Sequence, residues 1–282
     1  MPELLRDGRA RFGLAVLIVV VSIAVLAPFV SGRDPAAQGD IVATRFLTPF
    51  STDPAGSFHL LGTDRLGRDV WTRLAHGARI SLIVGVLATL LALTVGITIG
   101  TVAAVAGGPL RLGLLAVTDF ALALPRVVLL LLLAALWRPG GTLVVVVLGL
   151  TGWMSVARLV YGESSALLAR PFASAAIALG ASRRRIILRH LLPNTMTPII
   201  VAAALGIGNA ITLEAGLSFL GLGVQPPAPS WGGMISSGRD SIVNAPWVAL
   251  APGVALVLVV LACMLLGDAI RDRVARRAEM VT

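Results

Sequence analysis

The sequence predicts an all-α polytopic membrane protein with six transmembrane helices. Of its 282 residues, 57% are hydrophobic and 13% are charged, and the mean hydropathy is +0.92. A soluble domain carries about 25% charged residues, so this composition excludes a soluble core. Apolar runs that approach the roughly 20 residues needed for one bilayer crossing recur along the chain. These two observations and the placement of the arginines define the fold class.

The first predicted span follows a basic amino-terminal segment. Residues 1–11 contain three arginines, and residues 12–30 are strongly apolar. This run is long for the apolar region of a signal peptide, and no clean small-x-small cleavage pattern follows it. We therefore expect a membrane helix with a cytoplasmic amino end. Residues 31–79 are polar and contain several Pro and Gly residues, which predicts an external loop.

Three further spans follow at close spacing. The second is residues 80–106, which ends at a Gly-Gly-Pro turn. The third is residues 112–136, where Asp119 and Arg126 lie seven positions apart and would share one face of a regular helix. The fourth is residues 142–161, after a short external turn.

The carboxyl-terminal part begins with the predicted cytoplasmic segment 162–198. The fifth span, residues 199–217, comes next. A Gly- and Pro-rich external segment, residues 218–247, then leads to the sixth span, residues 248–266. Residues 267–282 are predicted to be a basic cytoplasmic tail.

The arginine distribution supports this orientation. The chain has no lysine and a net charge of +9, with 14 arginines in the predicted cytoplasmic segments and 8 in the external ones. Cytoplasmic segments of membrane proteins are enriched in basic residues, so both termini are predicted to be cytoplasmic. The arginines follow topology and form no stripe with aromatic residues, so we expect contact with membrane lipid and not with nucleic acid.

The most distinctive polar stretch is residues 172–198, an arginine-rich island between apolar runs. Its first part is rich in small residues, and Gly180 predicts a helix stop because glycine adopts positive φ without strain. Ser182 can cap a second helix, which is predicted to end at Pro193. Two short helices of this kind would form a docking surface, and the alternative is an ordinary amphipathic cytoplasmic loop.

This stretch resembles the EAA loop of the membrane subunits of bacterial ABC importers. The family pattern is roughly Glu-Ala-Ala, three residues, Gly, nine residues and a short ending in Leu-Pro, and Ser174 stands where the usual Glu would be. The resemblance implies a coupling helix that inserts into an ATPase subunit, with His190 either contacting that subunit or holding its own loop together. The residues assigned to this contact are Ser174, Ala175, Ala176, Gly180, Arg185, His190 and Pro193.

Three more stretches resemble the permeases of the dipeptide, oligopeptide and nickel importer group. They are residues 60–82, residues 214–235 and residues 266–274. The first contains charged residues expected to form a local ion-paired turn, with glycines that permit tight bends, although ligand binding is an alternative. Its candidate residues are Gly62, Asp64, Gly67, Arg68 and Asp69.

The resemblance implies the type I permease fold and a set of partner proteins. These are a second, homologous permease, two ATPase subunits or domains, and an external solute-binding protein, in the plasma membrane of a bacterium. A P-loop requires a lysine, and this chain has none, so ATP and Mg²⁺ would be bound by the partners and no cofactor by this chain. The solute would be a peptide or a related small molecule.

Charged residues inside predicted spans are costly and therefore candidate functional residues. Asp119 and Arg126 would line the translocation path or contact the second permease. Alternatively, Asp119 is hydrated near the inner surface and Arg126 extends toward water. Glu214 would either pair across the subunit interface or face the cavity.

Other functional classes lack their sequence signals. A stand-alone secondary transporter remains the alternative, but no clear internal repeat is present. No catalytic motif is present, so we expect no enzyme activity. His59 and His76 have no third ligand at metal-binding spacing, and Cys263 lies in an apolar run, so no metal site is expected.

Overall fold

The computed structural model describes residues 7–279, with the side chains of 174, 177, 178 and 274–279 left undescribed. Five long apolar helices in this part could each cross a membrane, and a bent pair of shorter helices brings the number to six. The all-α polytopic fold class is thereby confirmed. The long helices are α1 (Gly8–Ser31), α3 (Val70–Val105), α6 (Gly141–Leu168), α9 (Leu192–Phe219) and α11 (Trp247–Glu279).

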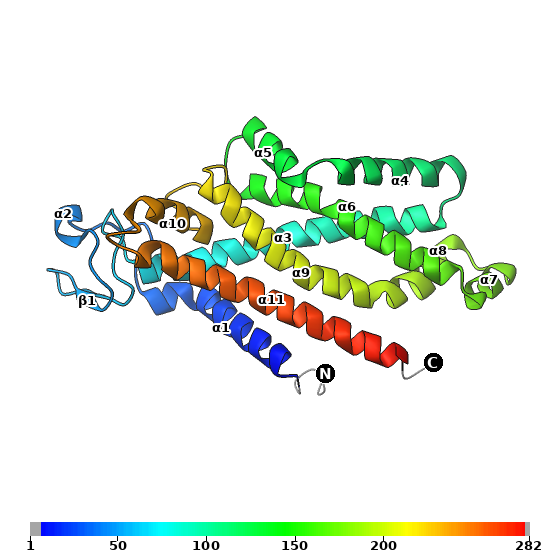
Figure 1. Cartoon of the computed structure of the whole chain (residues 1–282), viewed down its shortest axis with the longest axis horizontal. Coiled ribbons are helices and arrows are strands. Elements are labelled where there is room, and N and C mark those ends of the chain that lie inside the picture. Colours follow the sequence, from blue (N-terminus) through cyan, green and yellow to red (C-terminus); the bar gives the residue numbers. More distant parts are fainter. Residues whose placement is uncertain (1–6, 280–282) are drawn as a thin grey trace.

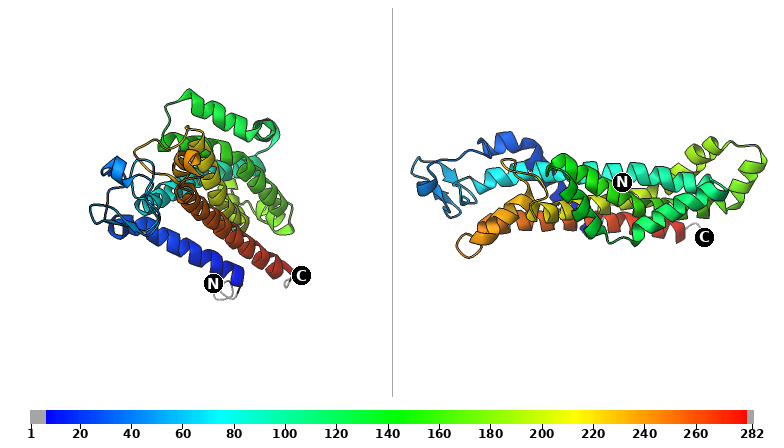
Figure 2. Two further views of the ribbon diagram at one scale, coloured as in Figure 1. Left: turned by 60° about the vertical axis from the view of Figure 1, so that its left-hand side comes forward. Right: turned by 90° about the horizontal axis from the view of Figure 1, so that it is seen from above.

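The bundle has two distinct ends (Figure 1). At one end lie α2 (Ile41–Thr44), the hairpin of β1 (Ser51–Thr52) and β2 (Phe58–His59), and α10 (Trp231–Gly238). At the other end lie α7 (Pro171–Ala178) and α8 (Arg183–Ile186). The start of α1 and the end of α11 both point toward the α7 end (Figures 1 and 2).

The close contact of α3 with α6 forms the centre of the bundle. Glycines allow this approach: a Cβ on Gly100 would lie 2.5 Å from the carbonyl oxygen of Ala157, and one on Gly96 would lie 2.8 Å from that of Trp153. Backbones that approach so closely gain dispersion contacts, which replace the hydrophobic driving force that is missing between helices in lipid.

The segment predicted as a third span is broken into two helices. These are α4 (Gly108–Ala123) and α5 (Arg126–Leu136), and their axes differ by 89°. Pro125 stands at the break, and Leu124 before it is extended, as a residue preceding proline prefers. The expectation that Asp119 and Arg126 share one helix face is therefore wrong.

Two other helix boundaries differ from the sequence interpretation. α3 starts at Val70, within the segment 31–79 predicted as an external loop, because Asp69 caps its first turn. The helix predicted to end at Pro193 instead continues through a π-helical turn, Ile187–Leu191, into α9. The N–H of Leu192 bonds to the carbonyl of Ile187, and this wider turn places Pro193 where a helix start tolerates proline.

Candidate functional site

The small-residue half of the docking loop is α7, which is exposed at one end of the bundle. Phe172 is 40% and Leu179 88% exposed, and Ala175 is also open to solvent, while Ala176 is half-buried. Ser174 belongs to α7, but its side chain lies outside the described residues. An exposed leucine beside exposed small residues makes an apolar surface on which a partner can pack.

The chain breaks after α7 at a glycine with positive φ, and a serine then caps α8, as the sequence predicts. Gly180 has φ +79°, and the hydroxyl of Ser182 accepts a hydrogen bond from the N–H of Arg185 at 3.3 Å. The side chain of Arg185 is exposed, as is Pro193. His190 is half-buried with its ring centroid 5.9 Å from that of Phe172, a contact within the loop itself.

Buried apolar side chains connect the docking loop to the long helices. Ile186 of α8 is 6% exposed and Leu191 of the π-helical turn is 1% exposed. The π-helical turn contacts both α3 and α6, and α7 contacts α6. The docking loop is therefore packed directly against both α3 and α6.

A cavity of about 580 Å³ lies midway along the bundle. Its wall comes from α3, α5, α6, α9 and α11 and is mainly apolar. Concave sites for small ligands usually measure about 300–1,000 Å³. The polar residues of the wall are Thr89, Arg126, Ser155, Asn209 and Thr212.

The structure separates the two charged residues of the third predicted span. Arg126 lines the cavity, where a Cβ on Gly152 would lie 3.4 Å from its Nη2. Asp119 lies on α4 and pairs with Arg158 of α6 at 2.6 Å, with both side chains about half exposed. Sequence reasoning missed Arg158, because nothing local indicates that α4 and α6 pack together.

Glu214 lies inside the chain, in contrast to both sequence-based alternatives. It is completely buried, and its two carboxyl oxygens accept hydrogen bonds from Ser218 at 2.7 Å and from Ser81 at 3.0 Å. Ser230 donates to Ser218, and the N–H of Trp231 donates to Ser81. This hydroxyl network joins α3, α9 and α10.

The turn before α3 is held by a buried ion pair. Asp64 accepts hydrogen bonds from Nε of Arg68 and from a backbone N–H of the same residue, at 2.7 and 3.1 Å. Gly62 and Gly67 both have φ +70°; a Cβ on Gly62 would clash with the carbonyl oxygen of Leu47, and one on Gly67 would clash with the hydroxyl of Thr44 at the end of α2. These contacts lie within the end of the bundle that carries the β-hairpin, and they give the motif a structural role.

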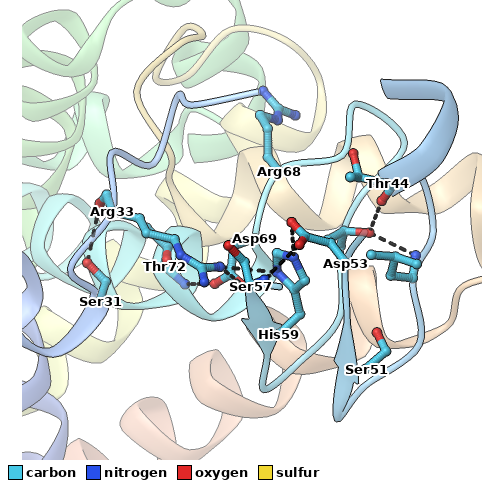
Figure 3. Close-up of polar contacts among 12 residues, drawn as sticks. Ser31, Arg33, Thr44, Ser51, Asp53, Ser57, His59, Arg68, Asp69 and Thr72 are labelled. Atoms are coloured by element: carbon cyan, nitrogen blue, oxygen red, sulfur yellow. Dashed lines mark hydrogen bonds and ion pairs between the residues drawn. The ribbon is translucent and has the colours of Figure 1, made fainter. Parts of the chain in front are cut away.

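Asp69 and His59 form a second polar cluster at this end (Figure 3). Asp69 caps α3 through Thr72 and lies 2.7 Å from Nδ1 of His59, whose other ring nitrogen is 3.5 Å from Asp53. The N–H of Ser57 donates to Asp53 at 2.7 Å and holds the pKa of that carboxyl below its usual value. Among the described residues, no three metal-binding side chains come together.

These features define a membrane transport subunit, with an apolar docking loop at one end, a polar cap at the other and a cavity between them. Residues 96–280 match the family model described as the binding-protein-dependent transport system inner membrane component. The chain is 38% identical to a putative peptide transport system permease protein of Brucella abortus, over 99% of this chain and 91% of the relative. It is 39% identical to the di/tripeptide transport system permease protein DppC of Pseudomonas aeruginosa, over 92% of this chain and 85% of the relative.

The chain therefore belongs to the family of binding-protein-dependent inner membrane permeases, and it is a permease subunit of an ABC importer. The family is one of transport permeases and not of enzymes. The fold is that of type I permeases, since a chain of the inward-facing MetNI methionine ABC transporter superposes with a TM-score of 0.59. That match has 21% identity and covers 71% of this chain and 95% of the other.

Proposed function

We propose that this chain imports peptides, as one of two homologous permease subunits that together enclose the translocation path. The observation that carries the proposal is the similarity over nearly the whole chain to relatives named for peptide transport. The cavity at mid-depth, with its mixture of apolar wall and few polar groups, suits a small peptide. A nickel chelate or another related solute is the competing cargo.

Coupling to ATP hydrolysis would occur at the docking loop. Two partner ATPase subunits or domains bind ATP and Mg²⁺, and their closure pushes on residues 175–193. Ile186 and Leu191 are buried against the bundle and pass the displacement to α3 and α6. An external solute-binding protein delivers the peptide at the opposite end.

The proposed orientation places the α7 end and both termini in the cytoplasm of a bacterium. Supporting this, α1 begins and α11 ends toward the α7 end (Figure 1). The docking loop there contains exposed Arg183, Arg184 and Arg185, in agreement with the bias of basic residues toward the cytoplasm.

Transport by a reconstituted complex tests the coupling step. Gly180→Trp adds a bulky side chain to the docking surface, and we expect it to abolish ATP-dependent peptide uptake while the subunit still reaches the membrane. Gly180→Asn separates the effect of the bulky side chain from that of backbone strain, because asparagine tolerates positive φ better than most residues. This variant should retain uptake. Gly8→Trp is the matched control, since Gly8 is exposed at the same end with nothing near its Cβ position.

Wild-type uptake by the Gly180→Trp complex would rule out the coupling role. Purification in mild detergent, with partners identified by mass spectrometry, tests the assembly independently. Recovery of a second permease and of P-loop ATPases is expected. Recovery of this chain alone, even after gentle cross-linking, would favour a stand-alone secondary transporter.

A further inference from the structure

Two buried polar atoms in the wall of the cavity lack hydrogen-bond partners among the described residues. They are Nε of Arg126 on α5 and Oγ1 of Thr89 on α3. Thr89 is only 6% exposed, and both residues line the same cavity. Buried polar atoms in native proteins are nearly always paired, so two unpaired ones on residues that line the same cavity indicate a hydrogen-bonding ligand.

The charge of the cavity limits what this ligand can be. The guanidinium of Arg126 is a cation, and among the described residues that line the cavity there is no Asp or Glu. Asp119 does not neutralise it, because that carboxylate pairs with Arg158 instead. A cation at membrane depth is costly unless an anion faces it. The amino-terminal end of α5 carries a partial positive charge, which adds to the potential around Arg126. The cap residue Pro125 makes no side-chain hydrogen bond to the first turn that would offset this charge.

The remaining wall indicates the size and character of the ligand. The cavity is mainly apolar around these donors, and Gly152 of α6 leaves room for the guanidinium, whose Nη2 would lie 3.4 Å from a Cβ at that position. A guanidinium fork and a hydroxyl are the donors that a carboxylate accepts from, often with two parallel hydrogen bonds to the arginine. A small molecule with one carboxylate and an apolar body fits this arrangement.

We propose that Arg126 and Thr89 form a carboxylate-binding site, which holds the terminal carboxylate of a short peptide during its passage through the membrane. The identity of the cargo as a peptide rests on the proposed function, whereas the anionic preference rests on the cavity alone. Arg126 on α5 supplies the charge, and Thr89 on α3 supplies a second donor from another helix of the wall.

Thiol modification tests the anionic preference without any transport substrate. The chain has a single cysteine, so Ser155→Cys in a Cys263→Ala background places one reporter thiol in the cavity wall. The complex is treated with negatively and positively charged methanethiosulfonates, and the ratio of the two rates is measured. Arg126→Gln should lower the anionic-to-cationic ratio at least about tenfold, since one unit charge is lost at low effective dielectric constant.

Arg138→Gln is the matched control, because this exposed arginine lies outside the cavity, and it should leave the ratio unchanged. The dipeptide dialanine should slow modification of the reporter, whereas dialanine amide, which lacks the carboxylate, should not. An unchanged rate ratio in Arg126→Gln, or equal protection by the two peptides, would overturn the proposed site.

Uptake of labelled dialanine by the reconstituted importer provides the second test. Arg126→Gln should reduce ATP-dependent uptake roughly tenfold, Arg126→Lys, which keeps the charge but not the fork, should cause a smaller loss, and Thr89→Val should also cause a smaller loss. Wild-type uptake by Arg126→Gln would overturn the site. If the wild-type importer takes up no dialanine, the peptide assignment fails, while the rate ratio still decides whether Arg126 makes the cavity selective for anions.

Discussion

Replacing Glu214 by leucine is expected to loosen the attachment of α10 to the bundle. Glu214 is the only acid in a buried network that otherwise consists of serine hydroxyls and backbone amides in the described part of the chain. Its two oxygens accept from Ser81 on α3 and from Ser218 on α9. Those hydroxyls in turn accept the N–H groups of Trp231 and Val224, so the carboxyl determines the direction of every hydroxyl in the network.

The magnitude follows from the two donors that lose their acceptor. Leucine has nearly the same size as glutamate, so little cavity forms, but the buried hydroxyl hydrogens of Ser81 and Ser218 lose their acceptor. Each buried unsatisfied donor costs about 1–3 kcal/mol, which gives about 2–6 kcal/mol for both. Even the lower value corresponds to roughly a 30-fold increase in the population in which α10 is detached.

Amide hydrogen exchange measured by mass spectrometry reports this detachment directly. The amides of Trp231 and Gly233 donate to hydroxyls of the network, so exchange in the peptide that covers α10 should accelerate at least about 30-fold in Glu214→Leu. Glu163→Leu makes the same substitution at an exposed site of α6 and should leave this exchange unchanged. Wild-type exchange rates in Glu214→Leu would refute the idea that the carboxyl organises the network.

The remaining predictions concern helix packing and the buried ion pair beside the β-hairpin. Gly100→Leu forces a side chain into the backbone of α6 and should destabilise the subunit by about 1–3 kcal/mol. Gly113→Leu is the control, because the space around its Cβ position is open, and it should not destabilise the subunit. Thermal unfolding of the complex in detergent measures the stability of both variants. Asp64→Ala leaves the buried Arg68 unpaired and should cost about 3–5 kcal/mol, seen as faster proteolysis of the end of the bundle that carries the β-hairpin. Asp240→Ala, which breaks an exposed ion pair, should leave proteolysis unchanged, and equal sensitivity of the two variants would contradict this reasoning.

Local signals in the sequence were sufficient for the fold class and for the break between the two short helices of the docking loop. Long apolar runs predict membrane helices because backbone groups in lipid must be paired within one segment. The glycine break and the serine cap around residues 180–182 depend only on backbone conformation and on a hydrogen bond three residues away. The ion pair of Asp64 with Arg68 spans four residues and is equally local.

Only the tertiary structure decided the roles of the intramembrane charges. Glu214 bonds to Ser81, which is 133 residues away, and Asp119 pairs across to α6, so periodicity within one segment could not identify either partner. The bend at Pro125 then turned Arg126 away from Asp119 and into the cavity. An apolar run specifies that a helix forms, but helix packing decides which charges meet, because burial and hydrogen bonding depend on neighbours that are distant in the sequence.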